Sequence, residues 1–169
     1  EVDVLFNVAG IQRRYKSEEF PLEEWNAVIN INLTVSFLMS QLAAREMIKR
    51  GKGGKIINTA SVLSFFGGYT VPAYAASKGG IAQLTKALSN EWSQYGINVN
   101  AIAPGGFRTE MTKALREDKK TEESIMERTP AGRWGEPQDL IGTVIYLASK
   151  ASDYVCGVIL PVDGGYLVR

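Results

Sequence analysis

The sequence predicts an α/β fold in which helices cover both faces of a parallel sheet. Three observations support this prediction. Short, almost wholly apolar runs of strand length recur along the chain, and long segments with apolar residues at helical spacing separate them. The order is strand, helix, strand, helix, strand, a polar excursion, helix and strand, and such alternation is typical of parallel sheets. No repeat or linker interrupts this order, so we expect one domain over residues 1–169.

The first strand is expected in the run VDVLFNVAG, which ends at Gly10. We expect it to be buried on both faces because it is apolar almost throughout. A polar connection follows, and Pro21 with acidic residues directly after it predicts the start of a helix. Apolar residues at helical spacing continue this helix to about Arg50, where basic residues and Gly51 end it.

The second strand is expected in KIINTAS, and a loop over VLSFFGGYTV follows it. A second long helix is predicted from about Pro72 to Tyr95, because proline suits a first helical turn and Gly96 suits a helix end. The run INVNAIAPGG predicts a third strand that is broken by Pro104 and Gly105.

The last third of the chain begins with a charged stretch, residues 106–134, for which we expect irregular structure or short helices. The run EPQDLIGTVIYLAS, residues 136–149, predicts a further helix with Pro137 near its start. The last strand is expected in GVILPVDGG.

Composition excludes several kinds of partner. Nineteen basic against eighteen acidic residues give a net charge of +1, so charge provides no reason to expect a nucleic-acid or anionic-membrane partner. No run approaches about 18 apolar residues and no secretory signal pattern is present, so we expect neither a membrane span nor secretion. The single cysteine, Cys156, excludes an intrachain disulfide and fits a reducing compartment. We therefore expect a cytoplasmic protein.

The chain contains no histidine. This absence excludes Ser-His-Asp and Cys-His catalysis and every metal site that needs histidine, and we expect no metal. Any general acid or base has to be Tyr, Lys, Asp, Glu or Cys.

The stretch PAYAASKGG places Tyr74 and Lys78 four residues apart, and therefore on one face of the predicted helix. Free tyrosine titrates near pH 10, and a neighbouring ammonium lowers the pKa because it favours the phenolate. The pair is a candidate proton-transfer unit. The plainer alternative is a packed tyrosine beside a solvated lysine, since such pairs are common.

Ser61 ends the strand KIINTAS and precedes Tyr74 by 74 − 61 = 13 residues. Ligands of open parallel sheets bind at the carboxyl ends of the strands, where a serine hydroxyl can hydrogen-bond a carbonyl oxygen that tyrosine protonates. A helix-cap or turn serine is the plainer alternative. The strand ends NVAG and NAIAPGG fall at the same edge, and their glycines let a ligand approach the backbone closely.

Five features occur in the order and spacing of the short-chain dehydrogenase/reductases: NVAG, Asn32 in INL, Ser61, YAASK and PGGFRT. The chain resembles this family over essentially all its residues. Within the family it is similar to the 2-deoxy-D-gluconate 3-dehydrogenases and gluconate 5-dehydrogenases, in stretches such as GIQRR, GGKIINTASVLSFFGG, ASDYV and VDGGYLVR. The resemblance implies a Rossmann-like doubly wound sheet, of which the chain holds the C-terminal two thirds. It also implies a homotetramer.

The resemblance implies reversible, NAD(P)-dependent oxidation of a secondary alcohol, with a sugar acid as the expected substrate and NAD favoured over NADP. Tyr74 would be the general acid/base, and Lys78 would lower its pKa and bind the nicotinamide ribose. Ser61 would orient the substrate, and Asn32 would hold a water in a proton relay toward the lysine. The residues expected near the cofactor are Asn7, Ala9, Gly10, Tyr74, Lys78, Pro104, Gly105 and Thr109.

The substrate's carboxylate would need a cation, since a guanidinium binds carboxylates in a bidentate manner. Arg13 and Arg14 follow the first strand's carboxyl end, and Arg108 and Arg133 are further candidates. Surface charge or a subunit contact is the plainer interpretation of all four.

Two departures from the family pattern stand out. Val8 replaces the second asparagine of N-N-A-G, which is expected to weaken the central sheet. The glycine-rich loop T-G-x-x-x-G-x-G is missing, and GKGGK follows a helix rather than a strand, so it is no substitute. We therefore expect a fragment that lacks about 80 to 90 residues ahead of Glu1, at roughly 30 residues per strand–helix unit.

Two alternatives to the dehydrogenase stay open. One is a catalytically inert fragment with a structural or oligomerisation role, because the nucleotide-binding part is not in this sequence. The other is an epimerase or lyase that uses the same tyrosine and lysine. The specific substrate, the physiological direction and the choice between NAD and NADP are not determined by the sequence.

Overall fold

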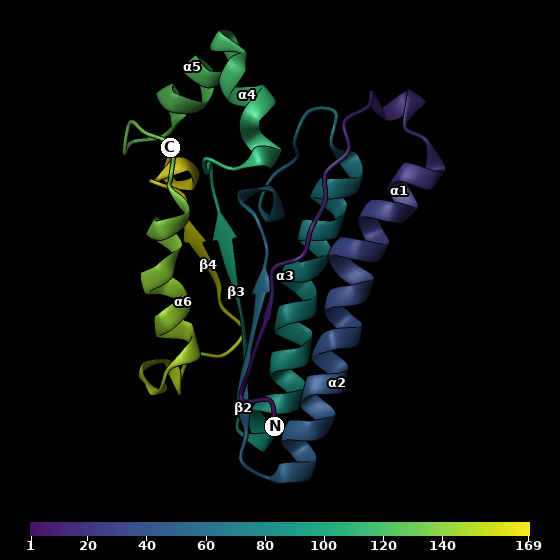
Figure 1. Ribbon diagram of the computed structural model, residues 1–169, viewed down its shortest axis with the longest axis vertical. Helices are drawn as coiled ribbons and strands as arrows, with labels where there is room; N and C mark the ends of the chain where they lie inside the picture. Colours follow the sequence, from purple (N-terminus) through teal and green to yellow (C-terminus); the bar gives the residue numbers. More distant parts are fainter.

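The computed structural model describes residues 1–169. Its centre is a four-stranded parallel sheet with the strand order β1-β2-β3-β4. Figure 1 shows α1, α2 and α3 on one face of this sheet and α6 on the other. The strands are β1 (Val4–Asn7), β2 (Gly54–Thr59), β3 (Ile97–Pro104) and β4 (Ile159–Val162). The helices are α1 (Leu22–Ile29), α2 (Val35–Arg50), α3 (Pro72–Trp92), α4 (Lys113–Glu117), α5 (Lys119–Arg128) and α6 (Ile141–Ala148). The predicted α/β doubly wound architecture is confirmed.

The core has two layers because successive residues of a strand point to opposite faces of the sheet. Ile56 of β2 packs with Met47 of α2 and Leu88 of α3. Its neighbour Ile57 points the other way and packs with Leu147 of α6. Burial on both faces explains why β2 and β3 are apolar runs rather than alternating ones.

The first strand differs from its prediction. It was expected to be buried on both faces, but β1 is only partly covered, since Val4 is 42% exposed and Val8, directly after the strand, is 61% exposed. Within residues 1–169, β1 pairs with β2 alone, so no strand of these residues lies along its other side. Apolar composition predicted the strand correctly, but its neighbours determine its burial.

The predicted helix over residues 22–50 is continuous but contains a turn of a different kind. A five-residue π-helical segment, Asn30–Thr34, joins α1 to α2. Such segments are frequent at functional sites, because they reorient side chains within a helix. Gly51 ends the helix in the left-handed conformation with φ 71°, as glycine at this position predicts.

By length and composition, the joined helix Leu22–Arg50 is apolar enough to cross a membrane, with a hydropathy of 1.5. We had not expected any such segment. Core helices meet the same criterion, and here Val28, Ala44 and Met47 are fully buried inside the protein. Leu22–Arg50 packs on the sheet through these buried residues and belongs to the layer of helices on that face.

The remaining elements follow the predictions closely. Helix α3 begins at Pro72, continues as a 3₁₀ turn to Tyr95 and stops at Gly96, whose φ is 72°. The helix expected over residues 136–149 is α6, preceded by a 3₁₀ turn that starts at Pro137. The charged stretch forms α4 and α5, which lie beyond the carboxyl ends of the strands, at the same end of the molecule as the start of α3 (Figure 1).

Candidate active site

Tyr74 and Lys78 lie in the first two turns of α3, where the structure brings them together. The Lys78 ammonium lies over the Tyr74 ring, 5.6 Å from its centroid. Lys78 is only 3% exposed, and its Nζ donates a 2.6 Å hydrogen bond to the carbonyl oxygen of Thr59, the last residue of β2. The lysine is therefore not a solvated surface charge, and the plainer alternative is wrong for this residue.

Burial shifts the pKa values of Tyr74 and Lys78 in the directions that favour their uncharged forms. Desolvation raises the pKa of Tyr74 above its ordinary value, and a hydrogen bond with Ser61 opposes this shift. Desolvation also lowers the pKa of Lys78 to about 8. We expected the ammonium to lower the pKa of the phenol, but the shift goes the other way, with burial as its largest cause. Tyr74 therefore carries its proton at neutral pH, which suits a general acid.

Ser61 has a fixed conformation beside this pair. Its Oγ accepts a hydrogen bond from the Leu63 amide at 3.1 Å, while Ser64 Oγ accepts one from the Ser61 amide at 3.2 Å. Ser64 Oγ in turn donates to the carbonyl oxygen of Lys78 at 2.7 Å. Ser61 is thus both a cap residue and a partner of Tyr74, and the cap holds its hydroxyl in place.

Asn32 lies in the π-helical segment and joins three parts of the chain. Its side chain exchanges two hydrogen bonds with the backbone of Ile11, at 2.8 and 2.9 Å. Its Nδ2 also donates to Ser77 Oγ at 3.0 Å, and Ser77 donates to the carbonyl oxygen of Tyr74 at 2.8 Å. One Nδ2 hydrogen is therefore used on the Ile11 backbone and the other on the Ser77 hydroxyl, and the predicted water-holding role of Asn32 stays a prediction.

Gly10 lies where β1 meets this cluster. A Cβ at Gly10 would lie 3.5 Å from Asn32 Oδ1 and 3.7 Å from Lys78 Nζ. Because Gly10 has no side chain, a ligand beside the Lys78 ammonium can approach the backbone of Gly10 closely. Ala9 beside it is exposed.

The side chain of Asn7 does not point into this space. Its Nδ2 donates to Asn58 Oδ1 at 2.8 Å and to Ser40 Oγ at 3.1 Å, in a buried polar network between the sheet and α2. Asn58 continues the network to Thr85 of α3 at 3.0 Å. Only the backbone of Asn7 remains available at the edge, and its carbonyl oxygen accepts from Thr59 Oγ1 at 2.7 Å.

The end of β3 forms the other side of the edge. Pro104 is the last residue of this strand, and Gly105 follows it. A Cβ at Gly105 would lie only 2.7 Å from Asp163 Cβ, so packing between the ends of β3 and β4 requires this glycine. Thr109 is exposed and caps the 3₁₀ turn Glu110–Thr112. The predicted cofactor contacts of these residues stay predictions.

Ion pairing separates the candidate arginines. Three of them are paired with acidic side chains: Arg13 with Glu24 at 2.7 Å, Arg108 with Glu136 at 3.0 Å and Arg133 with Asp139 at 2.7 Å. Arg14 instead lies 3.4 Å from the carbonyl oxygen of Tyr69 and from Thr70 Oγ1. Of the four, Arg14 is the one whose charge faces no acidic partner.

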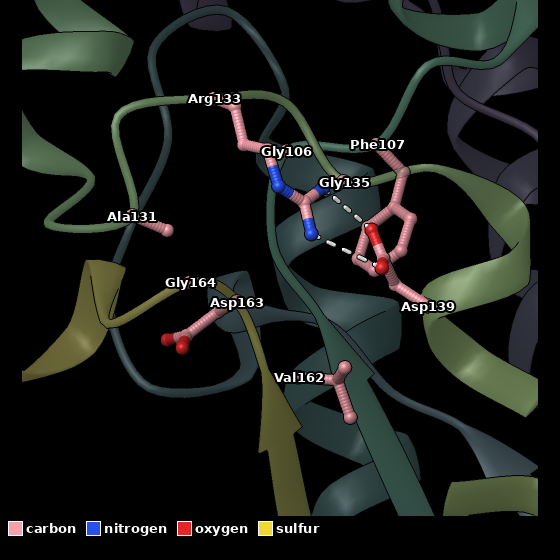
Figure 2. Close-up of a pocket in the computed structure, with 9 residues that line it drawn as sticks. All are labelled: Gly106, Phe107, Ala131, Arg133, Gly135, Asp139, Val162, Asp163 and Gly164. Carbon is pink, nitrogen blue, oxygen red and sulfur yellow. Dashed lines mark hydrogen bonds and ion pairs between the residues drawn. The ribbon is translucent and has the colours of Figure 1, made fainter. Parts of the chain in front are cut away.

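A pocket of about 200 Å³ lies between the ends of β3 and β4 and the residues before α6, but it does not contain Tyr74, Ser61 or Lys78. Figure 2 shows the Arg133 guanidinium directed at the Asp139 carboxylate across this pocket. The hydrogen bond from Arg133 lowers the pKa of Asp139 to about 2. Two of the residues that line this pocket, Arg133 and Asp139, are ion-paired with each other, and the pocket is separate from the tyrosine–lysine cluster.

The search by sequence missed two groups that the structure adds to the cluster. The Thr59 carbonyl oxygen accepts from Lys78, and no pattern in the sequence marks a backbone acceptor. Ser77 links Asn32 to Tyr74. Its spacing of three residues from Tyr74 and its place inside the quoted stretch were the signals that could have identified it.

The comparisons with known proteins agree with this geometry. A family model described as enoyl-(acyl carrier protein) reductase matches residues 1–167. The 2-dehydro-3-deoxy-D-gluconate 5-dehydrogenase of Bacillus subtilis is 57% identical over 169 residues, which are 100% of this chain and 66% of the relative. The 5-keto-D-gluconate 5-reductase of Escherichia coli K12 is 53% identical over 99% of this chain and 65% of its own length.

A solved structure extends the likeness to three dimensions. The gluconate 5-dehydrogenase of Burkholderia cenocepacia, in complex with NADP and tartrate, is 46% identical with a TM-score of 0.96, covering 99% of this chain and 65% of its own. Its cofactor is NADP, so the expected preference for NAD finds no support there. The chain spans about two thirds of the length of these relatives. Its sequence, its sheet and its tyrosine–lysine cluster together place the chain in the short-chain dehydrogenase/reductase family.

Proposed function

We propose that the intact protein is an NAD(P)-dependent oxidoreductase that interconverts a secondary alcohol and a ketone on a sugar acid. The observation that carries this proposal is the cluster of a proton-bearing Tyr74, Ser61 and a buried Lys78 where β2 and β3 end. The names of the relatives supply the substrate class, since all three act on gluconate or a keto derivative of it. The chain itself spans about two thirds of the length of those relatives.

Each side chain has a defined task in the reduction of a ketone. The Ser61 hydroxyl, held by its cap, hydrogen-bonds the carbonyl oxygen and orients it toward Tyr74. Tyr74 gives its proton to that oxygen as the alcohol forms, and takes it back in the oxidative direction. When bound, the nicotinamide cofactor would supply or accept the hydride.

The residues present fit the nicotinamide end of a dinucleotide at this edge. Lys78 uses one ammonium hydrogen on Thr59, which leaves two donors for the ribose hydroxyls of the cofactor. The bare backbone at Gly10 leaves room beside them. Tyr74, Lys78 and Gly10 would therefore hold the nicotinamide end, and the contacts proposed for Asn7, Ala9, Pro104, Gly105 and Thr109 belong to the same edge.

The test is a steady-state assay of the intact protein with a panel of C5 and C3 keto-gluconates and the matching alcohols, each with NAD(H) and NADP(H). We expect reduction of at least one keto acid and oxidation of the matching alcohol. Both rates are expected to differ between NAD(H) and NADP(H). Proton exchange at the substrate in the absence of any redox change would instead favour an epimerase or lyase. Absence of both activities, with assembly intact, would favour a structural role.

The structural alternative rests on a specific observation. Helix α2 exposes Leu38, Met39 and Leu42 by 44–54%, and such apolar surface is typical of a subunit interface. We propose that this surface contributes to a homotetramer, which analytical ultracentrifugation tests directly. Assembly and catalysis are compatible, so this interface alone does not favour the inert alternative.

Arg14 is proposed to bind the carboxylate of the substrate. Its guanidinium is partly desolvated, which lowers its pKa, and it contacts Thr70, four residues before Tyr74. Thr70 adopts a φ of 60°, a conformation that is strained for a residue other than glycine. Its carbonyl oxygen also accepts from the Tyr15 amide at 3.0 Å. This loop therefore holds Arg14 beside the start of α3.

Replacing Arg14 with glutamine is expected to raise KM for the acid substrate by about 10- to 100-fold with little change in kcat, since a charge-assisted hydrogen bond contributes roughly 1.5–3 kcal/mol to binding. The matched control is Arg13→Gln, which removes a neighbouring guanidinium that is already paired with Glu24. Equal effects of both changes, or an unchanged KM in Arg14→Gln, would contradict the assignment.

A further inference from the structure

Three residues from distant parts of the chain form a cluster beside the active-site edge. Phe66 lies in the loop between Ser61 and Tyr74, Arg128 ends α5, and Tyr166 lies in the last turn of the chain. The two rings are stacked, with centroids 5.8 Å apart and planes at 27°. The Arg128 guanidinium carbon lies over both, 4.9 Å from the Phe66 centroid and 4.4 Å from that of Tyr166. We call these three residues the aromatic–guanidinium cluster.

The last turn of the chain is bonded to the end of α5. The Ala131 amide donates to the Gly164 carbonyl oxygen at 3.0 Å, and Arg169 Nη1 donates to the Glu127 carbonyl oxygen at 2.7 Å. Asp163 stabilises the turn itself, because its carboxylate accepts from the amides of Gly165 and Leu167, both at 2.9 Å. Arg128 and Tyr166 therefore belong to one unit.

The loop that carries Phe66 is held at both of its ends. At one end is the Ser61 cap, and at the other Thr70 is bonded to Arg14 and Tyr15. The tip between them is open, with Phe65 51% and Tyr69 95% exposed. Phe66 turns from this tip toward the α5 side, so it links the tip to α5 and to the last turn of the chain.

This link joins α5 and the last turn of the chain to a loop that is flanked by two residues of the proposed site, Ser61 and Tyr74. Helices α4 and α5 lie beyond the strand ends, at the same end of the molecule as the start of α3 (Figure 1). Arg116 Nη2 of α4 donates to the carbonyl oxygen of Thr109, in the connection between β3 and α4, at 3.2 Å. The loop from Ser61 to Tyr74 meets the end of α5 through Phe66 and Arg128. Stacking and cation–π contacts at exposed positions are weak, on the order of tenfold in an equilibrium. Contacts of this strength can open and close during turnover.

We propose that the aromatic–guanidinium cluster is a latch that holds α4 and α5 against the loop after Ser61, and that Arg128 is a positioning residue for substrate binding. The role in substrate binding rests on the proposed function, whereas the latch itself does not. Arg128 acts through the loop, because the loop presents Thr70 to Arg14. Loss of the latch is expected to loosen substrate binding without removing any group from the proton-transfer cluster.

The test compares Tyr166→Leu and Arg128→Met with the matched control Tyr166→Phe, which keeps the stacked ring, all in the intact protein. Hydrogen–deuterium exchange is measured over residues 65–70 and 113–128. We expect exchange there to be about tenfold faster in the first two variants and unchanged in the control. Unchanged exchange in both variants overturns the latch, whether or not the protein is active.

Kinetics then test the positioning role. We expect KM to rise about three- to tenfold in Tyr166→Leu and Arg128→Met, with kcat unchanged or higher. In Tyr166→Phe we expect the KM of the unaltered protein. A fall in kcat at constant KM, or faster exchange with an unchanged KM, overturns the positioning role. If the unaltered protein reduces no keto acid, the proposed function fails, and the exchange measurement still decides the latch.

Discussion

Replacement of Tyr74 by phenylalanine is expected to lower kcat of the intact protein by roughly 10²–10⁴-fold, the contribution typical of a general acid or base. The change removes one oxygen and leaves the ring that packs against Lys78. Because burial raises the pKa of Tyr74, the phenol is the group that carries the proton at neutral pH. The chain contains no histidine that could replace it.

Steady-state rates in both directions measure this effect, and circular dichroism checks that the fold is kept. Tyr95→Phe is the matched control, since Tyr95 lies at the opposite end of α3 and is 46% exposed. We expect it to keep full activity. Retention of more than about a tenth of kcat in Tyr74→Phe is incompatible with the proposed role.

Replacement of Lys78 by methionine is expected to remove most of the activity and yet stabilise the cofactor-free protein at neutral pH. The pKa of Lys78 falls from 10.5 to about 8 because its charge is buried. The difference, 10.5 − 8, is about 2.5 units, or about 3 kcal/mol at about 1.36 kcal/mol per unit. Methionine avoids this penalty but loses the hydrogen bond to Thr59, which contributes about 1 kcal/mol. The expected net gain is about 2 kcal/mol.

The pH dependence distinguishes this cause from better packing. The folded pKa lies below the unfolded one, so between pH 8 and pH 10.5 the unfolded state binds more protons and stability rises with pH. The advantage of Lys78→Met is therefore fully present below about pH 8 and is lost toward pH 10.5.

Denaturant unfolding of both proteins at several pH values measures this difference. Lys86→Met, at an exposed position of the same helix, is the control and is expected to show no such pH-dependent gain. A destabilised Lys78→Met protein at pH 7 would show that the lysine is not held at a desolvation cost.

Several parts of the fold were predictable from local sequence, and each has a local cause. Pro72 and Gly96 bound α3 and its final 3₁₀ turn because proline and glycine restrict or widen the backbone angles of their own residues. Apolar runs predicted β2 and β3 as strands buried on both faces. The exposure of β1 was not predictable from its composition, because an edge strand and a central strand differ only in their neighbours.

The candidate site divides in the same way. Tyr74, Lys78, Ser61 and Asn32 were identified by residue type and spacing, and the structure places them in one cluster. The π-helical segment that carries Asn32 was missed, because one extra residue in a helical turn leaves the apolar pattern almost unchanged.

The sequence by itself determined the order of strands and helices and the residue types of the proposed proton-transfer cluster, because periodicity, helix ends and residue type are local properties. Only the tertiary structure decided that Tyr74 keeps its proton, that Lys78 is bound to Thr59, and that Arg14 rather than Arg13 has no acidic partner. The physical reason is that desolvation and ion pairing depend on atoms that distant segments bring within a few ångströms of one another.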